Sequence, residues 1–150
     1  MADETRRFDR PAALDRWFSR VYGALVGAGI GFAHNFVLEV RGRKSGRLYS
    51  TPVDVVRLGP RRYLVAPRGE TQWVRNARSS GQVTLRKGSR SEELALRELG
   101  DDEKPEVLKA YLDAFKRSVQ RFFPVPAGSP RDAFVPLARD YPTFELVAKR

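Results

Sequence analysis

Short apolar segments with a period of two residues constrain the fold of this chain most strongly. From residue 36 onward, apolar and polar residues alternate as expected of half-buried strands, and glycine-containing turns separate the segments. The strands expected on this basis are residues 36–41, 48–58, 63–66, 82–86, 92–99 and 143–147. Because most of the connecting turns are short, neighbouring strands should pair antiparallel, which indicates a barrel rather than a parallel sheet.

Helical periodicity marks the segments on both sides of the predicted barrel. Apolar residues recur at intervals of three and four between residues 14 and 26, and again between residues 108 and 119. A short helix at 69–80, ended by Gly81, and a helical segment at 131–139 are also expected. We expect one domain over residues 1–150, with an N-terminal helix at about 11–30, the barrel at about 36–99 and 143–148, and a helix at about 102–123.

The N-terminal region bears on location. Asp3 and Glu4 precede the first apolar segment, an order that is not typical of a signal peptide. The apolar stretch at residues 21–33 is shorter than the ~20 residues that a membrane-spanning helix needs. We therefore expect a cytoplasmic protein, with peripheral association with a membrane as the alternative.

Positive charge is the strongest compositional signal. The chain has 28 basic and 18 acidic residues, a formal net charge of +10. Such a balance favours anionic ligands, and nucleic acid, anionic lipid and a phosphorylated coenzyme all qualify. No recognition-helix or aromatic-platform motif accompanies the charge, so nucleic acid is not the expected partner.

A glycine-bounded basic turn offers a specific place for an anion. Gly42 and Gly46 enclose Arg43, Lys44 and Ser45, and both glycines allow a positive φ that lets successive N–H groups converge. The two cations would add charge-assisted hydrogen bonds. The alternative is an ordinary solvated basic turn, because sequences unrelated to anion binding often contain such a five-residue motif by chance.

The remaining residue types exclude several kinds of chemistry. The chain has no cysteine and one histidine, His34, which excludes disulfides, cysteine nucleophiles and histidine metal clusters; no metal site is expected. No glycine-serine elbow accompanies His34, so hydrolase chemistry is unsupported. An anion-binding turn without a strong nucleophile fits an enzyme whose cofactor carries out the reaction.

Four motifs, in this order and spacing, resemble the deazaflavin-dependent nitroreductases, flavin-like split-barrel enzymes of actinobacteria. The motifs are Gly42-Arg43-Lys44-Ser45-Gly46, Ser50-Thr51-Pro52-Val53, Tyr63-Leu64-Val65-Ala66 and Trp73-Val74-Arg75-Asn76-Ala77. The resemblance covers about half of the chain. It implies the α+β class, mainly β: a small antiparallel split β-barrel with flanking helices.

The resemblance also implies a cofactor, coenzyme F420, with FMN as the second choice. The basic turn would hold the phosphate and tail of the coenzyme, the following strand would bring its backbone against the deazaflavin ring, and the third strand and next helix would close the site. The positions carried over are Arg43, Lys44, Ser45, Thr51, Pro52, Val53, Ala66, Arg68, Gly69, Trp73 and Asn76.

The motifs do not specify the proton donor or the substrate pocket, and we infer both from neighbouring residues. Tyr49 stands where the family often has a cation, and its proximity to the basic turn makes it the candidate proton donor. Aromatic residues are candidates for the substrate pocket, although packing in the core is the favoured explanation for each of them. These residues are Trp17, Tyr22, Phe122, Phe123 and Phe134.

The function expected from the resemblance is an F420-dependent reductase. It would transfer a hydride from reduced deazaflavin to a small-molecule electron acceptor: a quinone, a nitroaromatic or an activated alkene. The first alternative is a carrier or sensor that binds deazaflavin or flavin without turnover. The second is a nucleic-acid-binding basic domain. The sequence leaves monomer and homodimer open.

Overall fold

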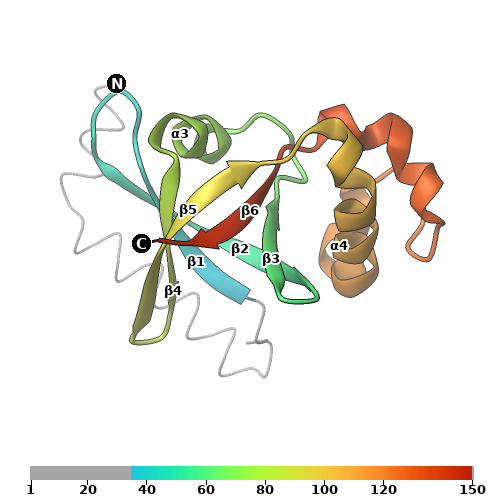
Figure 1. Cartoon of the computed structure of the whole chain (residues 1–150), viewed down its shortest axis with the longest axis horizontal. Coiled ribbons are helices and arrows are strands. Elements are labelled where there is room, and N and C mark those ends of the chain that lie inside the picture. The colour runs from blue at the N-terminus through green and yellow to red at the C-terminus, as the bar shows by residue number, and fades with distance from the viewer. Residues whose placement is uncertain (1–34, 150) are drawn as a thin grey trace.

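The computed structural model describes residues 35–149, and labels follow Figure 1. The N-terminal helix expected at about 11–30 lies outside the described residues. The same is true of Trp17, Tyr22 and His34. The strands are β1 (Asn35–Arg41), β2 (Leu48–Leu58), β3 (Arg61–Val65), β4 (Gln82–Lys87), β5 (Arg90–Glu98) and β6 (Thr143–Ala148). The helices are α3 (Gln72–Ser80) and α4 (Lys104–Val119), with 3-10 segments η1 (Asp101–Glu103), η2 (Gln120–Phe122) and η3 (Arg131–Asp140).

The six strands form a closed barrel in the order β1-β2-β3-β6-β5-β4, and every neighbouring pair is antiparallel. This confirms the predicted fold class. Each predicted strand coincides with an observed one to within a few residues, because alternation of apolar and polar residues follows the inward and outward faces of a barrel wall.

Strand β2 changes partners along its length. Its first half pairs with β1, where Pro52 lies opposite Val37, and its pairing with β3 begins only at Val55. At Pro52 the strand therefore has a neighbour on one side only. A proline has no N–H to donate, so it is tolerated at such a one-sided position.

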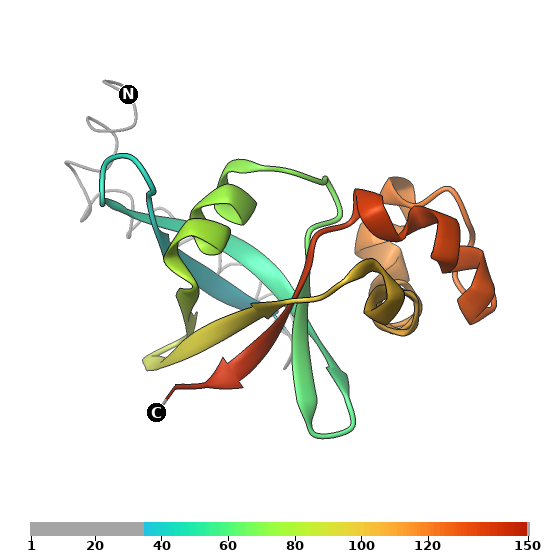
Figure 2. The same cartoon turned by 45° about the horizontal axis from the view of Figure 1, so that its top comes forward.

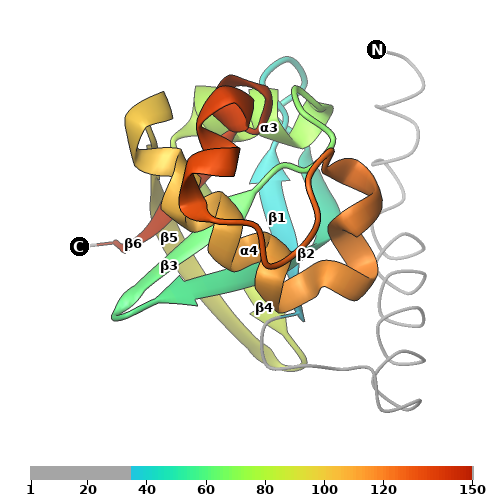
Figure 3. The same ribbon diagram turned by 90° about the vertical axis from the view of Figure 1, so that its right-hand side faces the viewer.

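Within the described residues, three apolar clusters hold the barrel and its helices together, and two of them are large. Leu38, Leu64, Leu85 and Leu94 fill the barrel and are each at most 2% exposed. Burying one such side chain stabilises the fold by about 2 kcal/mol. The second large cluster lies between the barrel, α4 and η3: α4 packs against β2 and β3, and η3 packs against α4 (Figure 3).

The helix ends follow local chemistry. Gly81 ends α3 in a left-handed conformation, φ 74°, and donates its N–H to the carbonyl of Ala77 at 2.8 Å, as predicted. Glu103 accepts the N–H of Gly100 at 3.0 Å, which fixes the acidic start of the next helical segment. The helix expected at about 102–123 is interrupted: 3-10 turns flank α4, and Phe115 inside it has non-helical φ and ψ of −118° and 27°.

Within residues 35–149, no helix combines the length and the apolar character that crossing a bilayer requires.

Candidate functional site

The β1–β2 hairpin is tightened by backbone hydrogen bonds. The Gly42 N–H donates to the carbonyl of Arg47 at 2.6 Å, and the Gly46 N–H donates to the carbonyl of Gly42 at 2.9 Å. Gly46 has the expected positive φ of 74°, but the expectation for Gly42 is wrong. Gly42 is required for a different reason: a Cβ built there would lie 2.5 Å from the ring of Tyr49.

Arg43 is fastened to α3 by two amide side chains. Its Nη1 donates to Asn76 Oδ1 at 2.8 Å and to Gln72 Oε1 at 2.9 Å, and its backbone N–H donates to the same Asn76 oxygen at 3.0 Å. Asn76 is only 3% exposed. The amide therefore fixes both the main chain and the guanidinium of Arg43. Figure 2 shows the hairpin beside α3.

A cavity of about 200 Å³ lies between the hairpin and α3, and we call it the hairpin cavity. Its lining residues are Gly42, Arg43, Lys44, Ser45, Tyr49, Gln72 and Asn76. The cavity therefore brings together the predicted anion-binding residues of the basic turn with Tyr49 and Asn76. Binding sites for whole drug-sized ligands are usually about 300–1,000 Å³, so this space suits one end of a coenzyme.

The charge of the hairpin cavity is not neutralised. The partners of Arg43 are neutral amides, and Lys44 is exposed. Among residues 35–149, no carboxylate forms an ion pair with Arg43 or Lys44, and no carboxylate lines the cavity. Uncompensated cations around a polar cavity favour an anion such as a phosphate.

The opposite end of α3 is held by carboxylates. Arg78 donates to Glu70 at 2.7 and 3.0 Å and to Glu98 at 2.8 and 2.7 Å. The hydrogen bond from Arg78 holds the pKa of Glu70 below its ordinary value, and the bonds to the two carboxylates raise the pKa of Arg78. This cluster ties the loop before α3 to β5.

The second group of predicted site residues lies on β2. Thr51, Pro52 and Val53 face β1 across the ladder, and Thr51 and Val53 are partly buried. Thr51 follows Tyr49 by two residues, which corresponds to roughly 7 Å along a strand. These residues therefore continue away from the hairpin cavity without lining it.

The residues after β3 have packing contacts. Ala66 is buried and donates its N–H to the carbonyl of Pro142 at 2.9 Å, while Gly69 has a φ of 82° that favours glycine. Trp73 is partly buried, with its ring 6.0 Å from that of Phe144. Arg68 lies over the ring of Phe122, at 5.3 Å from its centroid. None of these predicted contacts lines the hairpin cavity.

The predicted substrate pocket is corrected in part. Phe134 is 0% exposed, and Phe123 is buried with its ring stacked on that of Tyr141 at 4.5 Å. Both are core residues, because the helical segments close over them. Phe122 is partly buried, and Arg68 and Arg121 lie over its ring.

Sequence reasoning missed Gln72. It precedes Asn76 by four residues on α3, so both amides lie on one face of the helix and reach Arg43 together. That spacing was the available signal. Thr71, immediately before Gln72, has the one side-chain polar atom among the described residues, Oγ1, that is buried without a hydrogen-bond partner.

Comparisons with known proteins agree on one family of folds. A protein-family model described as F420H(2)-dependent quinone reductase matches residues 14–120. Among solved structures, an F420-H2 dependent reductase is 18% identical, with 76% of this chain and 94% of that chain covered and a TM-score of 0.53. No curated protein matches the chain.

Two further solved structures are similar. One is described as a domain-swapped dimer, at 16% identity, with 88% of this chain and 98% of that chain covered and a TM-score of 0.53. The other is a protein of unknown function from Agrobacterium tumefaciens, at 17% identity and a TM-score of 0.56, with 78% of this chain covered. The chain spans about half of the length of that second protein, 49%.

Proposed function

Because the chain belongs to the F420H(2)-dependent quinone reductase family, we propose that it transfers a hydride from reduced coenzyme F420 to a quinone. Membership of this family makes the protein an F420-dependent oxidoreductase, and F420 its cofactor. The identity of the acceptor, the residues that hold the coenzyme and the route of the proton belong to the proposal.

The observation that carries the proposal is the way Arg43 is held. Gln72 and Asn76 fix its guanidinium through neutral oxygens, so it is oriented without losing its charge. Lys44 adds a second uncompensated cation to the same cavity. F420 carries a phosphodiester and an oligoglutamate tail, and the donor set of the hairpin cavity fits such an anion.

The remaining contacts follow from the direction of β2. With the phosphate end of the coenzyme in the hairpin cavity, Thr51, Pro52 and Val53 would contact the deazaflavin ring further along the strand. Arg68 and Phe122 would border the acceptor. Bound reduced F420 supplies the hydride. The chain binds, orients and shields the reactants.

The position of Tyr49 in the structure favours a role in binding over the role of proton donor that the sequence indicated. Its ring contacts the Gly42 backbone and lines the same cavity as the two cations. If that cavity holds the phosphate, Tyr49 lies at the phosphate end, and we assign it to binding instead of proton donation. A quinone oxygen would then take its proton from water or from another residue.

The test uses the purified full chain, coenzyme F420 and FMN. Binding of each is followed by titration, and reoxidation of reduced F420 by menadione is followed optically against a control without protein. Selective binding of F420 with faster reoxidation supports the reductase, and a nitroaromatic or an activated alkene in place of menadione ranks the acceptors. Tight binding without any turnover would favour the carrier.

A double substitution tests the cation pair. Arg43→Ala with Lys44→Ala removes two charge-assisted contacts and should weaken F420 binding by roughly a hundredfold or more. The matched control is Lys116→Ala with Arg117→Ala, which removes the same charge from an exposed part of α4. A folded Arg43/Lys44 variant that keeps its F420 affinity would contradict the assignment of the cavity.

Oligomeric state and location stay predictions. Monomer and homodimer are both compatible with the sequence, and one similar structure is described as a domain-swapped dimer. Light scattering of the full chain in solution separates the two states. Fractionation of expressing cells, followed by a salt wash of the membranes, tests the expected cytoplasmic location against peripheral association.

A further inference from the structure

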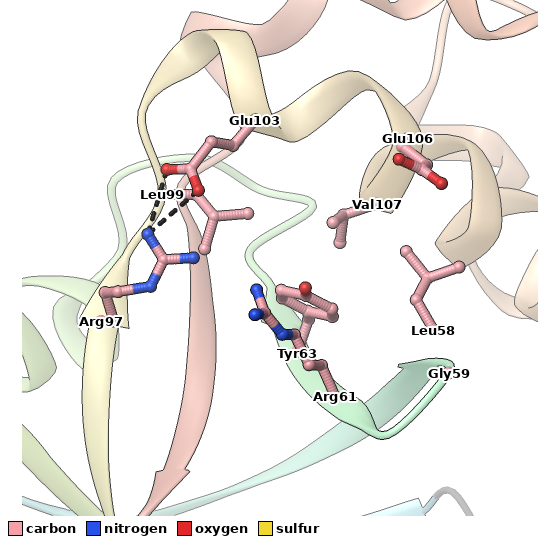
Figure 4. A pocket seen from close by; sticks show the side chains of 9 residues that line it. All are labelled: Leu58, Gly59, Arg61, Tyr63, Arg97, Leu99, Glu103, Glu106 and Val107. Atoms are coloured by element: carbon pink, nitrogen blue, oxygen red, sulfur yellow. Dashed lines mark hydrogen bonds and ion pairs between the residues drawn. The ribbon is translucent and has the colours of Figure 1, made fainter.

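A second cavity lies at the far end of β2, between the β2–β3 turn and the start of α4 (Figure 4). We call it the turn cavity. Its volume is about 510 Å³, which is within the usual range of small-molecule sites. The eleven residues of β2 separate it from the hairpin cavity, a distance of roughly 30 Å along a strand. It is therefore distinct from the proposed cofactor site.

Tyr63 presents an unpartnered hydroxyl to the turn cavity. The residue is only 7% exposed, so its ring is part of the core. Its hydroxyl has no hydrogen-bond partner among the described residues, yet it is not sealed from solvent. Figure 4 shows that the hydroxyl points away from the barrel wall, toward the space bordered by α4. A buried tyrosine usually finds a partner, so this group is suited to a ligand.

The two arginines that line the turn cavity differ in their pairing. Arg97 is satisfied, because it donates to Glu145 at 2.9 Å and to Glu103 at 3.1 Å. Arg61 lies 3.8 Å from Glu145 and also interacts with Glu103 through its charge, but it donates no hydrogen bond to either carboxylate, and its side chain is 61% exposed. The guanidinium of Arg61 therefore retains donors for a carboxylate.

The other side chains that line the turn cavity are three apolar ones and two acids, Glu103 and Glu106, and Glu103 is already paired with Arg97. Leu99 and Val107 are buried, and Leu58 is partly buried. Glu106, in the first turn of α4, is exposed and has no ion pair with any described residue. It can accept a hydrogen bond from a hydroxyl or an amine of a ligand.

We propose that the turn cavity binds a small aromatic carboxylate that carries a hydrogen-bond donor at its far end. Arg61 and the Tyr63 hydroxyl hold the carboxylate, the apolar residues contact the ring, and Glu106 accepts from the donor. Gly59, with φ 59°, makes the turn that brings the backbone of Arg61 opposite Leu58 at the start of β3. This proposal does not rest on the proposed function.

The test compares three probes on the full chain, with the amide resonance of Gly59 as a local reporter. 4-Hydroxyphenylacetate has both polar ends, phenylacetate lacks the hydroxyl, and 4-hydroxyphenethyl alcohol lacks the carboxylate. The first should bind with a dissociation constant in the low millimolar range, as expected for a ligand of this size. Phenylacetate should bind several-fold more weakly, and the alcohol roughly tenfold more weakly.

Substitutions distinguish binding of the probe in the turn cavity from nonspecific attraction of its carboxylate to the basic surface. Arg61→Gln should weaken binding of 4-hydroxyphenylacetate roughly tenfold. The matched control, Arg62→Gln, should leave it unchanged, because Arg62 pairs with Glu92 instead of lining the cavity. Tyr63→Phe keeps the ring and should weaken both carboxylates several-fold, and Glu106→Ala should erase the preference for the hydroxylated probe.

Two results would overturn the proposal. One is the absence of any saturable shift of Gly59 with the first probe at concentrations well above the expected dissociation constant. The other is equal weakening by Arg61→Gln and Arg62→Gln, which would indicate diffuse charge. Adding F420 should leave probe binding unchanged, so failure of this site leaves the proposed function standing.

Discussion

The two arginines attached to α3 are immobilised in opposite ways. Arg43 is held at one end of the helix by the amides of Gln72 and Asn76, whereas Arg78 at the other end is held by the carboxylates of Glu70 and Glu98. Both guanidinium groups have defined positions. Only that of Arg43 keeps an uncompensated positive charge, which separates a cation available to a ligand from one that holds the fold together.

The same distinction applies to other arginines of the barrel. Arg62 pairs with Glu92, and Arg86 pairs with Glu39. A carboxylate partner stabilises an arginine but cancels its field, while an amide orients it and leaves the field intact. The kind of partner is therefore more informative than the number of cations in a chain with a net charge of +10.

Among single substitutions around α3, turning an amide into a carboxylate should have the largest effect. Asn76→Asp would place a negative charge against Arg43 and cancel the charge of the cavity. We expect F420 binding to weaken ten- to a hundredfold, with little loss of thermal stability, because the new ion pair replaces the lost amide contacts. Calorimetric titration at two salt concentrations and thermal unfolding measure both.

An unchanged F420 affinity in Asn76→Asp would contradict the distinction between amide-held and carboxylate-held arginines. It would mean that the field of Arg43 does not matter for the coenzyme.

Reshaping the hairpin without changing charge should have a smaller effect. In Gly42→Ala, the added Cβ would meet the ring of Tyr49, so the ring or the hairpin must move. We expect a loss of about 1–2 kcal/mol in the free energy of unfolding and several-fold weaker F420 binding. Urea unfolding and the same titration measure these effects. Gly88→Ala, in the β4–β5 turn at φ 62°, is the control that should strain a turn without affecting F420.

Removing a carboxylate at the other end of α3 should affect stability alone. Glu98→Gln breaks an exposed ion pair with Arg78 and should cost less than about 1 kcal/mol. F420 affinity should stay within twofold of the parent, because neither Arg78 nor Glu98 lines the hairpin cavity. A larger loss of affinity would show that the ion pairs of Arg78 help to position α3 for the coenzyme.

The smallest expected effect is a pH dependence confined to the carboxylate end. The hydrogen bond from Arg78 lowers the pKa of Glu70 from its ordinary 4.5, so the pair contributes stability above that value and loses it as the pH falls through the lowered pKa. Thermal unfolding of the parent and Glu70→Gln should therefore differ above about pH 4.5 and converge in more acidic buffer. A constant difference would exclude this ionisation as the cause.

The sequence predicted the barrel well because its signals are local. Alternation of apolar and polar residues, together with Gly46 and Gly81 at turns, marks each strand and helix end independently of distant residues. The basic turn that lines the hairpin cavity could be predicted for the same reason, because it is a continuous sequence motif.

The remaining features depend on tertiary contacts. The need for Gly42 arises from the ring of Tyr49 and not from its own φ, and the burial of Phe123 and Phe134 depends on how η3 closes over α4. Gln72 reads as an ordinary polar helix residue until Arg43, far away in sequence, is seen beside it. Periodicity shows which face of a helix a residue occupies, and it does not show what the fold brings to that face.

The position of β6 has a consequence for synthesis. Residues 143–148 lie between β3 and β5, so those two strands remain unpaired on one side until the chain has been made through β6. During translation the earlier strands exist as an open sheet with two free edges, which is a surface prone to strand addition. Nascent chains truncated before residue 143 should therefore need chaperone protection, whereas chains that include β6 can close the ring and remove both edges.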